Sequence, residues 1–536
     1  MAFYLRTESI KSEEIMDLSV INASDESTIA ALISPEPCLI EGSRGTGKSF
    51  LMRVAEQRIE MHSNQSLSVF ISFNISSLVT TNDPLQFYHW MLAKSLKGLI
   101  NKLRKKGLTV SPFAASLLSN DEFSKESDVE KDLKKIVRRF EDSYRGSNEV
   151  EISNLPDIED VKEAIEDICS ANNLSRIYFF FDEAAHVFRP DQQRQFFSLF
   201  KDLRSPFITC NAAIYPGVTY FGDSFEPNHD CTYKRIERGI FEPDYLQYFR
   251  DIVNKQADDN LKKAIDVQES VFNCLALSSG GNPRILLRTI QDLEKVNSSS
   301  ANKEIKAFYR GKIWAEHTEL GEKYAGHKSI VDWGRDFLES QVIPAIEAYN
   351  DSRRSNNSEE ATIFFWIHKD CPASVKEALR LLTYTGIIRK VDSSVRATRS
   401  QLGARYEVKY GCVLSSDSSP TAESASFFSK ISLKKFPEFG KNHPAYSDVR
   451  DIETHILTDQ QYLSALQSML QKPVDVLPLL TEWQKDKLKS ANIFTIEQLH
   501  LNSEEDLIES IYGVGPARAR TIKNAATAEL LEYLSG

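Results

Sequence analysis

One eight-residue segment constrains the fold of this chain more than any other. Gly42-Ser43-Arg44-Gly45-Thr46-Gly47-Lys48-Ser49 fits the pattern GxxxxGK[ST]. It lies between a short apolar run at 38–40 and a stretch of helical character at 50–54, as a phosphate-binding loop requires. In this position successive backbone N–H groups point at phosphate oxygens, at the positive end of the helix dipole. The alternative is a glycine-rich turn that binds nothing.

The last two residues of the segment carry most of the expected chemistry. The Lys48 ammonium would reach the β- and γ-phosphates of ATP, and the Ser49 hydroxyl would ligate Mg²⁺. The nucleotide-binding residues predicted for the loop are Gly42, Ser43, Arg44, Gly45, Thr46, Gly47, Lys48, Ser49 and Phe50.

Strands and helices alternate along the following 170 residues or so. Residues 69–73 and 177–181 are continuous apolar runs, which is typical of strands buried on both faces of a parallel sheet. A further strand is predicted at 207–210, and apolar residues at helical spacing predict helices at 87–106 and 128–144. The alternation indicates an α/β fold with a parallel sheet.

An acidic pair, Asp182-Glu183, ends the predicted strand at 177–181. Opposite a phosphate loop, Asp182 would hold Mg²⁺, mostly through water, and Glu183 would polarise the water that attacks the γ-phosphate. Strands often end in acidic residues, so the pair alone is weak evidence for a catalytic site. It gains weight because a phosphate loop lies upstream. Together with Lys48, it predicts an ATPase that hydrolyses ATP to ADP and phosphate.

Two further residues are candidates for contact with the γ-phosphate. Asn211 follows the predicted strand at 207–210 and would hydrogen-bond the phosphate or the attacking water. Thr209 competes for this role, and an Asn that merely begins a turn is the alternative. Arg284 falls in the first turn of a helix that begins at Pro283. Because an arginine is unfavourable at the positive end of a helix, we expect Arg284 to face a phosphate.

The chain resembles an AAA+ ATPase in its phosphate loop, acidic pair, polar strand end, helical segment and Gly-Gly-Asn-Pro-Arg sequence at 280–284. More narrowly, residues 1 to about 300, including the run from Leu5 to Leu18, resemble the origin-recognition (initiator) branch and the related signal-transducing ATPases with numerous domains. The resemblance implies a helical lid at 243–300 and a homo-oligomer in which an arginine of a neighbouring subunit completes each site.

The resemblance makes Arg235 the expected arginine finger. It lies in the basic cluster 234–238, just before the apparent last sheet segment at 240–243. A solvated basic cluster explains the same residues. The chain departs from the family in a long polar insertion at about 107–156, to which the sequence assigns no role.

A capped helix and two strands follow the lid. Ser374 and Glu377 fit an S-x-x-E capping box, and Gly386 is positioned to end the helix. Strands are predicted at 387–391 and 405–410. This order resembles a winged helix, in which the helix would enter the major groove of DNA and the loop between the strands would contact the DNA backbone.

The charge of this region favours DNA contact. Residues 361–410 carry nine Lys and Arg against four Asp and Glu, a net of +5 in a chain of net -11. The predicted phosphate contacts are Lys376, Arg380, Arg396 and Arg399. Winged helices also serve as dimerisation or packing units, which is the alternative.

The C-terminal residues resemble a helix-hairpin-helix motif, with Tyr512-Gly513-Val514-Gly515-Pro516 at its turn. The resemblance implies that backbone N–H groups of the turn bind a DNA phosphate, through Gly513, Gly515, Arg518 and Arg520. Residues 481–536 carry six Lys and Arg against nine Asp and Glu, a net of -3, whereas DNA binding without sequence preference normally comes with positive charge. A protein-docking module is therefore the alternative.

The length of 536 residues predicts several domains rather than one core. We expect a nucleotide-binding domain with an N-terminal extension at 1–242, a helical lid at 243–300, a winged-helix domain with a helical lead-in at 301–440, a connector at 441–476 and a helix-hairpin-helix domain at 477–536.

Composition excludes several classes of protein. No apolar run approaches the ~20 residues of a membrane helix, and residues 1–10 carry charges where a signal peptide would be apolar, so a cytoplasmic protein without a membrane partner is expected. Seven scattered cysteines form no CxxC pair. The net charge of -11 argues against a protein that coats nucleic acid with its whole surface.

Two functions agree with these features. The first is an ATP-dependent AAA+ ATPase that uses ATP and Mg²⁺ to assemble on DNA, which we expect to be double-stranded. The second is a switch ATPase of a prokaryotic signalling or anti-phage defence system, which holds ATP while a partner effector docks on the C-terminal modules. The sequence contains no recognisable second catalytic centre, so a cutting activity would come from a protein partner.

Overall fold

A computed structural model gives the fold of the chain. It describes residues 3–62, 65–73, 84–119, 126–141, 155–183, 190–217, 219, 221, 225–323, 327–356, 360–397, 400–449, 470–477 and 479–535. None of the helices within these ranges has both the length and the apolar character needed to cross a membrane.

The chain divides into two compact units, Met1–Asp258 with Gly281–Leu287, and Asp259–Gly280 with Arg288–Gly536. This division cuts through the predicted lid at 243–300. The predicted domain boundaries stay predictions.

The first unit is built on a five-stranded parallel sheet. Its strands are β1 (Cys38–Glu41), β2 (Ser66–Ser72), β3 (Arg176–Asp182), β4 (Ile208–Ile214) and β5 (Thr232–Arg235). Their order in the sheet is β2-β3-β4-β1-β5, and every neighbouring pair is parallel. The carboxyl ends of all five strands therefore lie at one edge, where the phosphate loop follows β1.

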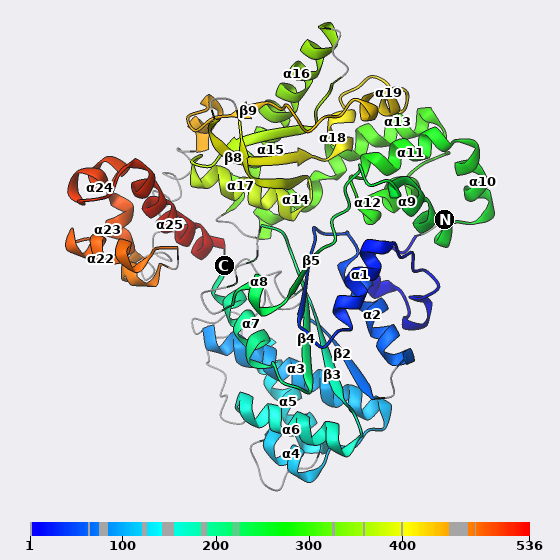
Figure 1. Ribbon diagram of the computed structural model, residues 1–536, viewed down its shortest axis with the longest axis vertical. Coiled ribbons are helices and arrows are strands. Elements are labelled where there is room, and N and C mark those ends of the chain that lie inside the picture. The colour runs from blue at the N-terminus through cyan, green and yellow to red at the C-terminus, as the bar shows by residue number, and fades with distance from the viewer. Residues whose placement is uncertain are drawn as a thin grey trace. The chain divides into compact units, whose positions relative to one another are not determined.

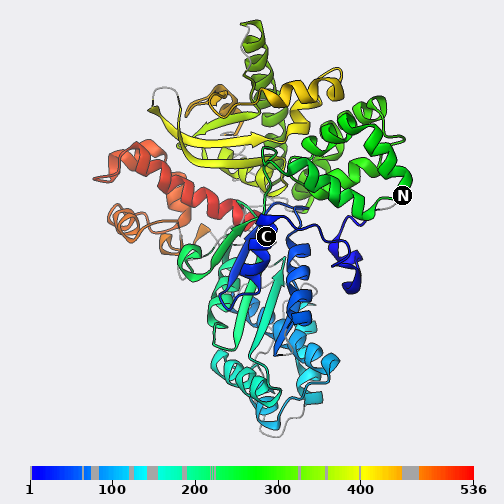
Figure 2. The ribbon, with the colours of Figure 1, turned by 45° about the vertical axis from the view of Figure 1, so that its right-hand side comes forward.

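Alternate residues of the strands pack against different helices. Phe179 and Phe181 of β3 face one hydrophobic cluster, whereas Tyr178 and Phe180 face another. The first cluster contains residues of α3 (Pro84–Lys106), α4 (Pro112–Ser119), α5 (Glu126–Glu141), α6 (Ile158–Ala171) and α7 (Pro190–Asp202), and the second contains residues of α1 (Ala23–Leu32) and α2 (Lys48–His62). Helices thus cover both faces of the sheet (Figure 1, Figure 2), and the predicted α/β fold is confirmed.

The predicted insertion contributes to the core of this unit. Helices α4 and α5 lie within it, and Leu133, Val137 and Phe140 of α5 are buried in the same cluster as α3. The insertion therefore widens the helical layer on one face of the sheet. Residues 120–125 and 142–154 lie outside the described residues.

Two strand predictions are corrected. Strand β4 continues to Ile214, so Asn211 lies inside it rather than at its end. The last strand is Thr232–Arg235, whereas residues 240–243 form no strand. Strand β5 is short and lies at an edge of the sheet, with half-buried side chains, so it lacks the apolar run that revealed the central strands.

A short helix, α8 (Pro227–Asp230), lies between β4 and β5. The helices after β5 are α9 (Tyr245–Gln256), α10 (Asp259–Val267), α11 (Glu269–Ser278), α12 (Pro283–Gln291), α13 (Ser298–Ala307), α14 (Trp314–Lys323), α15 (Lys328–Phe337) and α16 (Ile343–Ser355), of which α9 to α12 fall within the predicted lid at 243–300. The compact division assigns α9 and the start of α12 to the first unit, and α10 and α11 to the second.

The second unit contains a four-stranded sheet, ordered β7-β8-β6-β9. Its strands are β6 (Phe364–His368), β7 (Ile388–Arg396), β8 (Leu402–Val408) and β9 (Glu438–Phe439), with helices α17 (Ala373–Tyr384), α18 (Tyr410–Leu414) and α19 (Pro420–Ser429). Strands β7 and β8 overlap the two strands predicted at 387–391 and 405–410, and they pair antiparallel. The sequence prediction missed β6, which pairs with β8.

The predicted capping box of α17 is wrong, whereas its predicted end is confirmed. The helix begins at Ala373 after Pro372, and no side chain caps it. Ser374 is buried, and Glu377 instead accepts hydrogen bonds from Arg380. Gly386 has φ +74°, a conformation that favours glycine at the end of a helix.

The C-terminal part of the second unit contains three short helices, α22 (Glu482–Ser490), α23 (Ile496–Leu501) and α24 (Glu504–Ser510), and the longer α25 (Pro516–Ser535). Thr481, Thr495 and Ser503 cap the first three through reciprocal capping boxes. Between α24 and α25 the chain turns at Gly513, whose φ is +89°. The side chains between these helices form a hydrophobic core of their own.

Candidate nucleotide-binding site

The backbone of the phosphate loop requires its glycines. Gly45 and Gly47 have φ of +83° and +100°, which a residue with a side chain rarely adopts. A Cβ atom at Gly42 would lie 2.6 Å from the Thr46 hydroxyl, closer than real Cβ atoms approach another heavy atom. The loop curls at the amino end of α2, the geometry that the motif predicts.

Residues 281–287 pack directly against this loop. The Asn282 side-chain amide donates a hydrogen bond to the Arg44 carbonyl oxygen (2.7 Å), and its oxygen accepts the Ile285 N–H (3.2 Å) at the start of α12. A Cβ atom at Gly45 would lie 2.7 Å from the Asn282 Oδ1. The start of α12 and the phosphate loop, about 240 residues apart, therefore form one structure.

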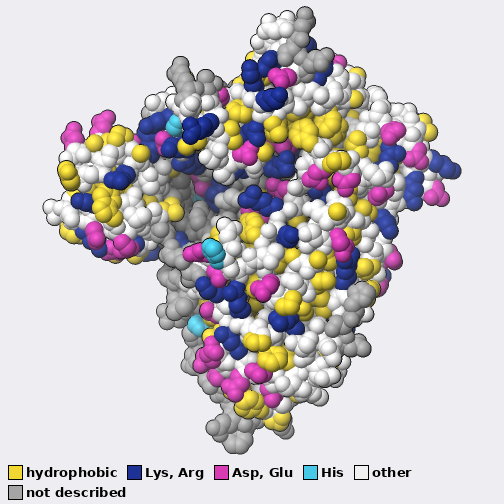
Figure 3. Space-filling view, in the orientation of Figure 1, with side chains coloured by type: hydrophobic (Ala, Val, Ile, Leu, Met, Phe, Trp, Pro, Cys, Tyr) yellow, Lys and Arg dark blue, Asp and Glu magenta, His cyan; other side chains and the backbone are white. Residues whose placement is uncertain are grey.

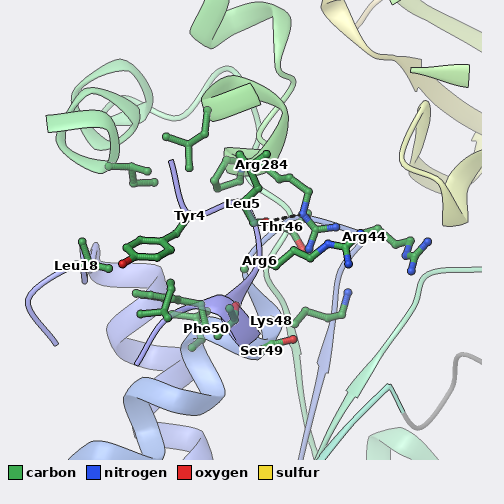
Figure 4. Close-up of a pocket in the computed structure, with 18 of the residues that line it drawn as sticks. Tyr4, Leu5, Arg6, Leu18, Arg44, Thr46, Lys48, Ser49, Phe50 and Arg284 are labelled. Atoms are coloured by element: carbon green, nitrogen blue, oxygen red, sulfur yellow. Dashed lines mark hydrogen bonds between the residues drawn. The ribbon is translucent and has the colours of Figure 1, made fainter. Parts of the chain in front are cut away.

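A cavity of about 160 Å³ opens beside the loop. Figure 4 shows that the cationic side chains of Arg44 and Lys48 extend to one side of it, whereas Tyr4, Leu18 and Phe50 lie on the other. The cavity thus has a basic end and an end of aromatic and aliphatic side chains. Its lining includes Tyr4, Leu5, Arg6, Thr7, Glu8, Ile10, Leu18, Val20, Arg44, Gly45, Thr46, Gly47, Lys48, Ser49, Phe50, Glu183, Tyr215, Arg238, Tyr248, Ile252, Gln256, Arg284 and Leu287.

Lys48 is held within the loop that precedes it. Its ammonium donates to the carbonyl oxygens of Gly42 (2.5 Å) and Ser43 (3.0 Å) and lies 3.9 Å from the centre of the Tyr215 ring. Burial lowers the pKa of Lys48 to about 7, and the Asp182 carboxylate opposes this shift. An anion at the basic end of the cavity would favour the charged ammonium.

The acidic pair lies at the carboxyl end of β3. Asp182 is buried and accepts a hydrogen bond from the Ser49 hydroxyl, and burial raises its pKa. Glu183 has φ +57°, an uncommon conformation for a residue with a side chain. Its carboxylate lines the cavity and accepts a hydrogen bond from the Ser72 hydroxyl (3.5 Å), and its pKa is raised by burial and by the charge of Asp182.

The Ser49 hydroxyl and the Asp182 carboxylate fit the donor set of Mg²⁺. Both are hard oxygen ligands and hydrogen-bond each other beside the loop. No cluster of three or more His, Cys, Asp or Glu that could hold a metal is found in the described part of the chain. A cation at Ser49 and Asp182 would therefore take its remaining ligands from water and phosphate, as Mg²⁺ commonly does.

Two arginines border the loop from other parts of the chain. Arg284 lines the cavity, and its Nε donates to the Leu5 carbonyl oxygen (2.9 Å; Figure 4); its contact with a phosphate stays a prediction. Arg238 donates to the Thr46 carbonyl oxygen (3.1 Å) and forms a buried ion pair with Asp25. The sequence analysis did not single out Arg238 within its basic cluster.

Arg235 is not among the residues that line the cavity. Its side chain is 73% exposed on the edge strand β5 and forms an ion pair with Glu41 at 3.0 Å. An exposed arginine at a sheet edge is accessible to a second subunit, and its role as a finger stays a prediction.

Asn211 does not reach the cavity, so its predicted contact with a phosphate is wrong. It lies opposite Cys38, at the start of β1, and is fully buried. Its side-chain oxygen accepts the Cys38 N–H (3.1 Å), and its amide donates to the Leu32 carbonyl oxygen (2.9 Å). Asn211 therefore joins the end of α1 to the sheet, and Tyr215, just after β4, lines the cavity instead.

Two predicted DNA contacts at the second sheet are exposed, and one is not. Lys376 is the exposed residue of α17, and Arg396 is exposed at the end of β7. Arg380 is instead held in a largely buried ion pair with Glu377, so its predicted phosphate contact is corrected. Arg399 lies outside the described residues.

Of the phosphate contacts predicted at the C-terminal turn, three lie at or beside the turn and one is held in an ion pair. Gly513 and Gly515 form the turn before α25, and Arg518 donates to the Gly513 carbonyl oxygen (2.7 Å). Arg520 instead pairs with Glu504 through two hydrogen bonds of 3.0 and 3.1 Å, so it is not available as the predicted phosphate contact.

Replacement of Asn211 by alanine tests its structural role. We expect the free energy of unfolding to fall by about 1–3 kcal/mol, because the Cys38 N–H and the Leu32 carbonyl would lose buried partners. Urea-induced unfolding followed by circular dichroism measures the change. Asn260→Ala, at an exposed position of α10, is the control and should change stability by less than about 0.5 kcal/mol. Unchanged stability in Asn211→Ala would contradict this assignment.

Comparison with known proteins finds only distant structural similarity. No protein-family model and no curated protein sequence matches the chain. Two solved structures resemble it at 12% sequence identity: the Orc1 protein of Aeropyrum pernix in complex with DNA (TM-score 0.33, covering 78% of this chain and 97% of that one) and a RuvB variant of Thermotoga maritima (TM-score 0.29, covering 72% of this chain and 92% of that one).

Because the two matches are distant, the interpretation of this chain rests on its own parallel sheet, phosphate loop and docked 281–287 segment. These features agree with the predicted α/β core, a parallel sheet with a phosphate loop after β1.

Proposed function

We propose that the protein is an ATP-dependent DNA-binding ATPase that assembles on DNA under the control of ATP. One observation carries the proposal: Lys48, Glu183 and Arg284, from three distant parts of the sequence, line one cavity beside the phosphate loop. The basic end of this cavity suits a triphosphate, and the end with Tyr4, Leu18 and Phe50 suits a nucleobase.

Different side chains bind the phosphates, activate the attacking water and hold Mg²⁺ in this proposal. Backbone N–H groups of the loop and the Lys48 ammonium bind the phosphates, and Arg284 adds a second positive charge from α12. Glu183 orients the attacking water and accepts its proton, a role that a carboxyl group of raised pKa performs well. Bound at Ser49 and Asp182, Mg²⁺ would supply charge neutralisation at the phosphate oxygens.

A neighbouring subunit completes the site through Arg235 in this proposal. The exposure of Arg235 on edge strand β5 supports an intersubunit role, since a buried arginine could not reach a second protomer. ATP would then link two subunits, and oligomerisation would depend on the bound nucleotide.

DNA is held by the two C-terminal modules in this proposal. The sheet with helix α17 acts as a winged helix, supported by the exposure of Lys376 and Arg396 within a region of net +5. The turn at Gly513 to Gly515 acts as a helix-hairpin-helix, supported by its position between α24 and α25.

Two substitutions test hydrolysis. Lys48→Ala should weaken ATP binding about tenfold or more, because charge-assisted hydrogen bonds to phosphate are lost. Glu183→Gln keeps the shape of the side chain, so it should bind ATP normally but hydrolyse it about 10²-fold more slowly or worse. Phosphate release by purified protein, with and without duplex DNA, measures both. Undiminished hydrolysis by Glu183→Gln would contradict the proposed catalytic role, and negligible turnover by wild-type protein that binds ATP would favour the switch ATPase with a partner effector.

Complementation tests Arg235. Arg235→Ala and Lys48→Ala proteins should each hydrolyse ATP about 10³-fold more slowly than wild type, the usual effect of losing an arginine finger or the loop lysine. A mixture of the two should recover part of the activity, because an oligomer can then pair an intact loop with an intact Arg235. Full activity of Arg235→Ala alone, or no recovery on mixing, argues against a finger that acts between subunits.

Salt dependence tests the winged-helix surface. Lys376→Ala and Arg396→Ala should each weaken duplex binding and reduce the slope of log affinity against log salt by about 0.9, one phosphate contact each. Fluorescence anisotropy at several salt concentrations gives these slopes. Lys263→Ala, which removes an exposed charge from α10, is the matched control and should leave the slope unchanged. Identical slopes in wild type and the three variants would contradict the proposed phosphate contacts.

A further inference from the structure

Two aromatic rings are exposed at the C-terminal turn. Tyr512 is 93% exposed and Trp483, on α22, is 42% exposed. A Cβ atom at Gly513 would lie 3.5 Å from the Trp483 ring, so this ring lies beside the turn. Figure 3 shows hydrophobic side chains on the surface of the part that carries α22 to α24. Single exposed hydrophobic residues are ordinary, whereas two rings gathered at one turn indicate a binding surface.

Two cations accompany these rings. The Lys487 ammonium lies 5.7 Å from the centre of the Trp483 ring and 5.8 Å from that of Tyr512, so it bridges the two. The Arg518 guanidinium lies 4.9 Å from the Trp483 ring. These distances are within the range of cation–π attraction, which orients the rings and the charges together.

The charges at this turn differ from the others of the module. Lys485, Lys489 and Arg520 pair with Glu482, Asp475 and Glu504, respectively. For Lys487 and Arg518, no ion pair to a carboxylate is found among the described residues. Residues 481–536 are acidic as a whole, yet Lys487 and Arg518 both lie at the exposed rings.

The two exposed rings and the two cations beside them favour one class of binding partner. A purely apolar protein surface would bury two charges without compensation, which is costly. A nucleic acid supplies both complements, because its bases stack on aromatic faces and its phosphates attract the cations. In a duplex the bases are already stacked and paired, so only unpaired bases present a free face.

We propose that Tyr512 and Trp483 form a stacking platform for the unpaired bases of single-stranded DNA, with Lys487 and Arg518 as its phosphate contacts. This inference rests on the proposed DNA-binding function and adds to it a second substrate form. The winged-helix surface would hold duplex DNA, and the C-terminal turn would hold an adjacent unpaired strand.

The test uses the full chain and two fluorescein-labelled probes of equal length: an oligo(dT) strand and the same sugar-phosphate backbone without bases. Wild type should bind oligo(dT) about fivefold more tightly or better than the abasic strand, because stacking contributes only to the former. Tyr512→Ala should lose this preference, whereas Tyr512→Phe, which keeps the ring, should retain it. Phe494→Ala, which removes an exposed ring elsewhere in the module, is the matched control.

A second comparison isolates the charge. Lys487→Ala should weaken binding to both strands, whereas Lys489→Ala, which removes a charge already paired with Asp475, should have a smaller effect. Quenching of tryptophan fluorescence by oligo(dT) should decrease in Trp483→Phe. This readout reports stacking at the ring independently of affinity.

The outcomes separate this inference from the proposed function. Equal affinity of wild type for the two strands, or unchanged preference in Tyr512→Ala, would overturn the stacking platform and leave the surface to a protein partner. If duplex binding persisted in that case, the proposed DNA-binding function would still stand. Absence of binding to any DNA, with ATP bound normally, would overturn both.

Discussion

The contact between the phosphate loop and Asn282 is the interaction on which the nucleotide site depends. The Asn282 amide bonds the Arg44 carbonyl oxygen, and its oxygen lies so close to Gly45 that only a glycine fits. This contact brings the start of α12 to the loop, and with it Arg284, which lines the cavity. Without it, a phosphate loop would remain, but the residues that close the cavity from the far end of the sequence would not.

The edge of the sheet is joined to the same loop through β5 and the residues after it. Glu237 accepts the Ser43 N–H (3.2 Å), and Arg238 bonds the Thr46 carbonyl oxygen. The backbone of Arg238 also packs against Gly281: a Cβ atom at Gly281 would lie 2.1 Å from the Arg238 carbonyl oxygen. Residues 236–238 thus connect the exposed Arg235 at the edge of the sheet to the phosphate loop.

The sequence predicted features that are local and missed those that depend on tertiary partners. The phosphate loop and the acidic pair were found because their chemistry lies in consecutive residues. Asn211 was misplaced because a buried Asn interrupts the apolar run of β4, and only Cys38 and Leu32 reveal its role. Arg380 and Arg520 were misassigned because a count of charges does not show that Glu377 and Glu504 occupy them.

Isothermal titration of the full chain with ATP in the presence of Mg²⁺ tests the central claim most directly. We expect saturable binding of one ATP per chain, with an affinity in the micromolar range typical of enzyme substrates. Asn282→Ala should bind ATP more weakly, because it loses the contact between the loop and α12. A flat titration at millimolar ATP, or full affinity in Asn282→Ala, would contradict the claim that the loop and the 281–287 segment form one nucleotide site.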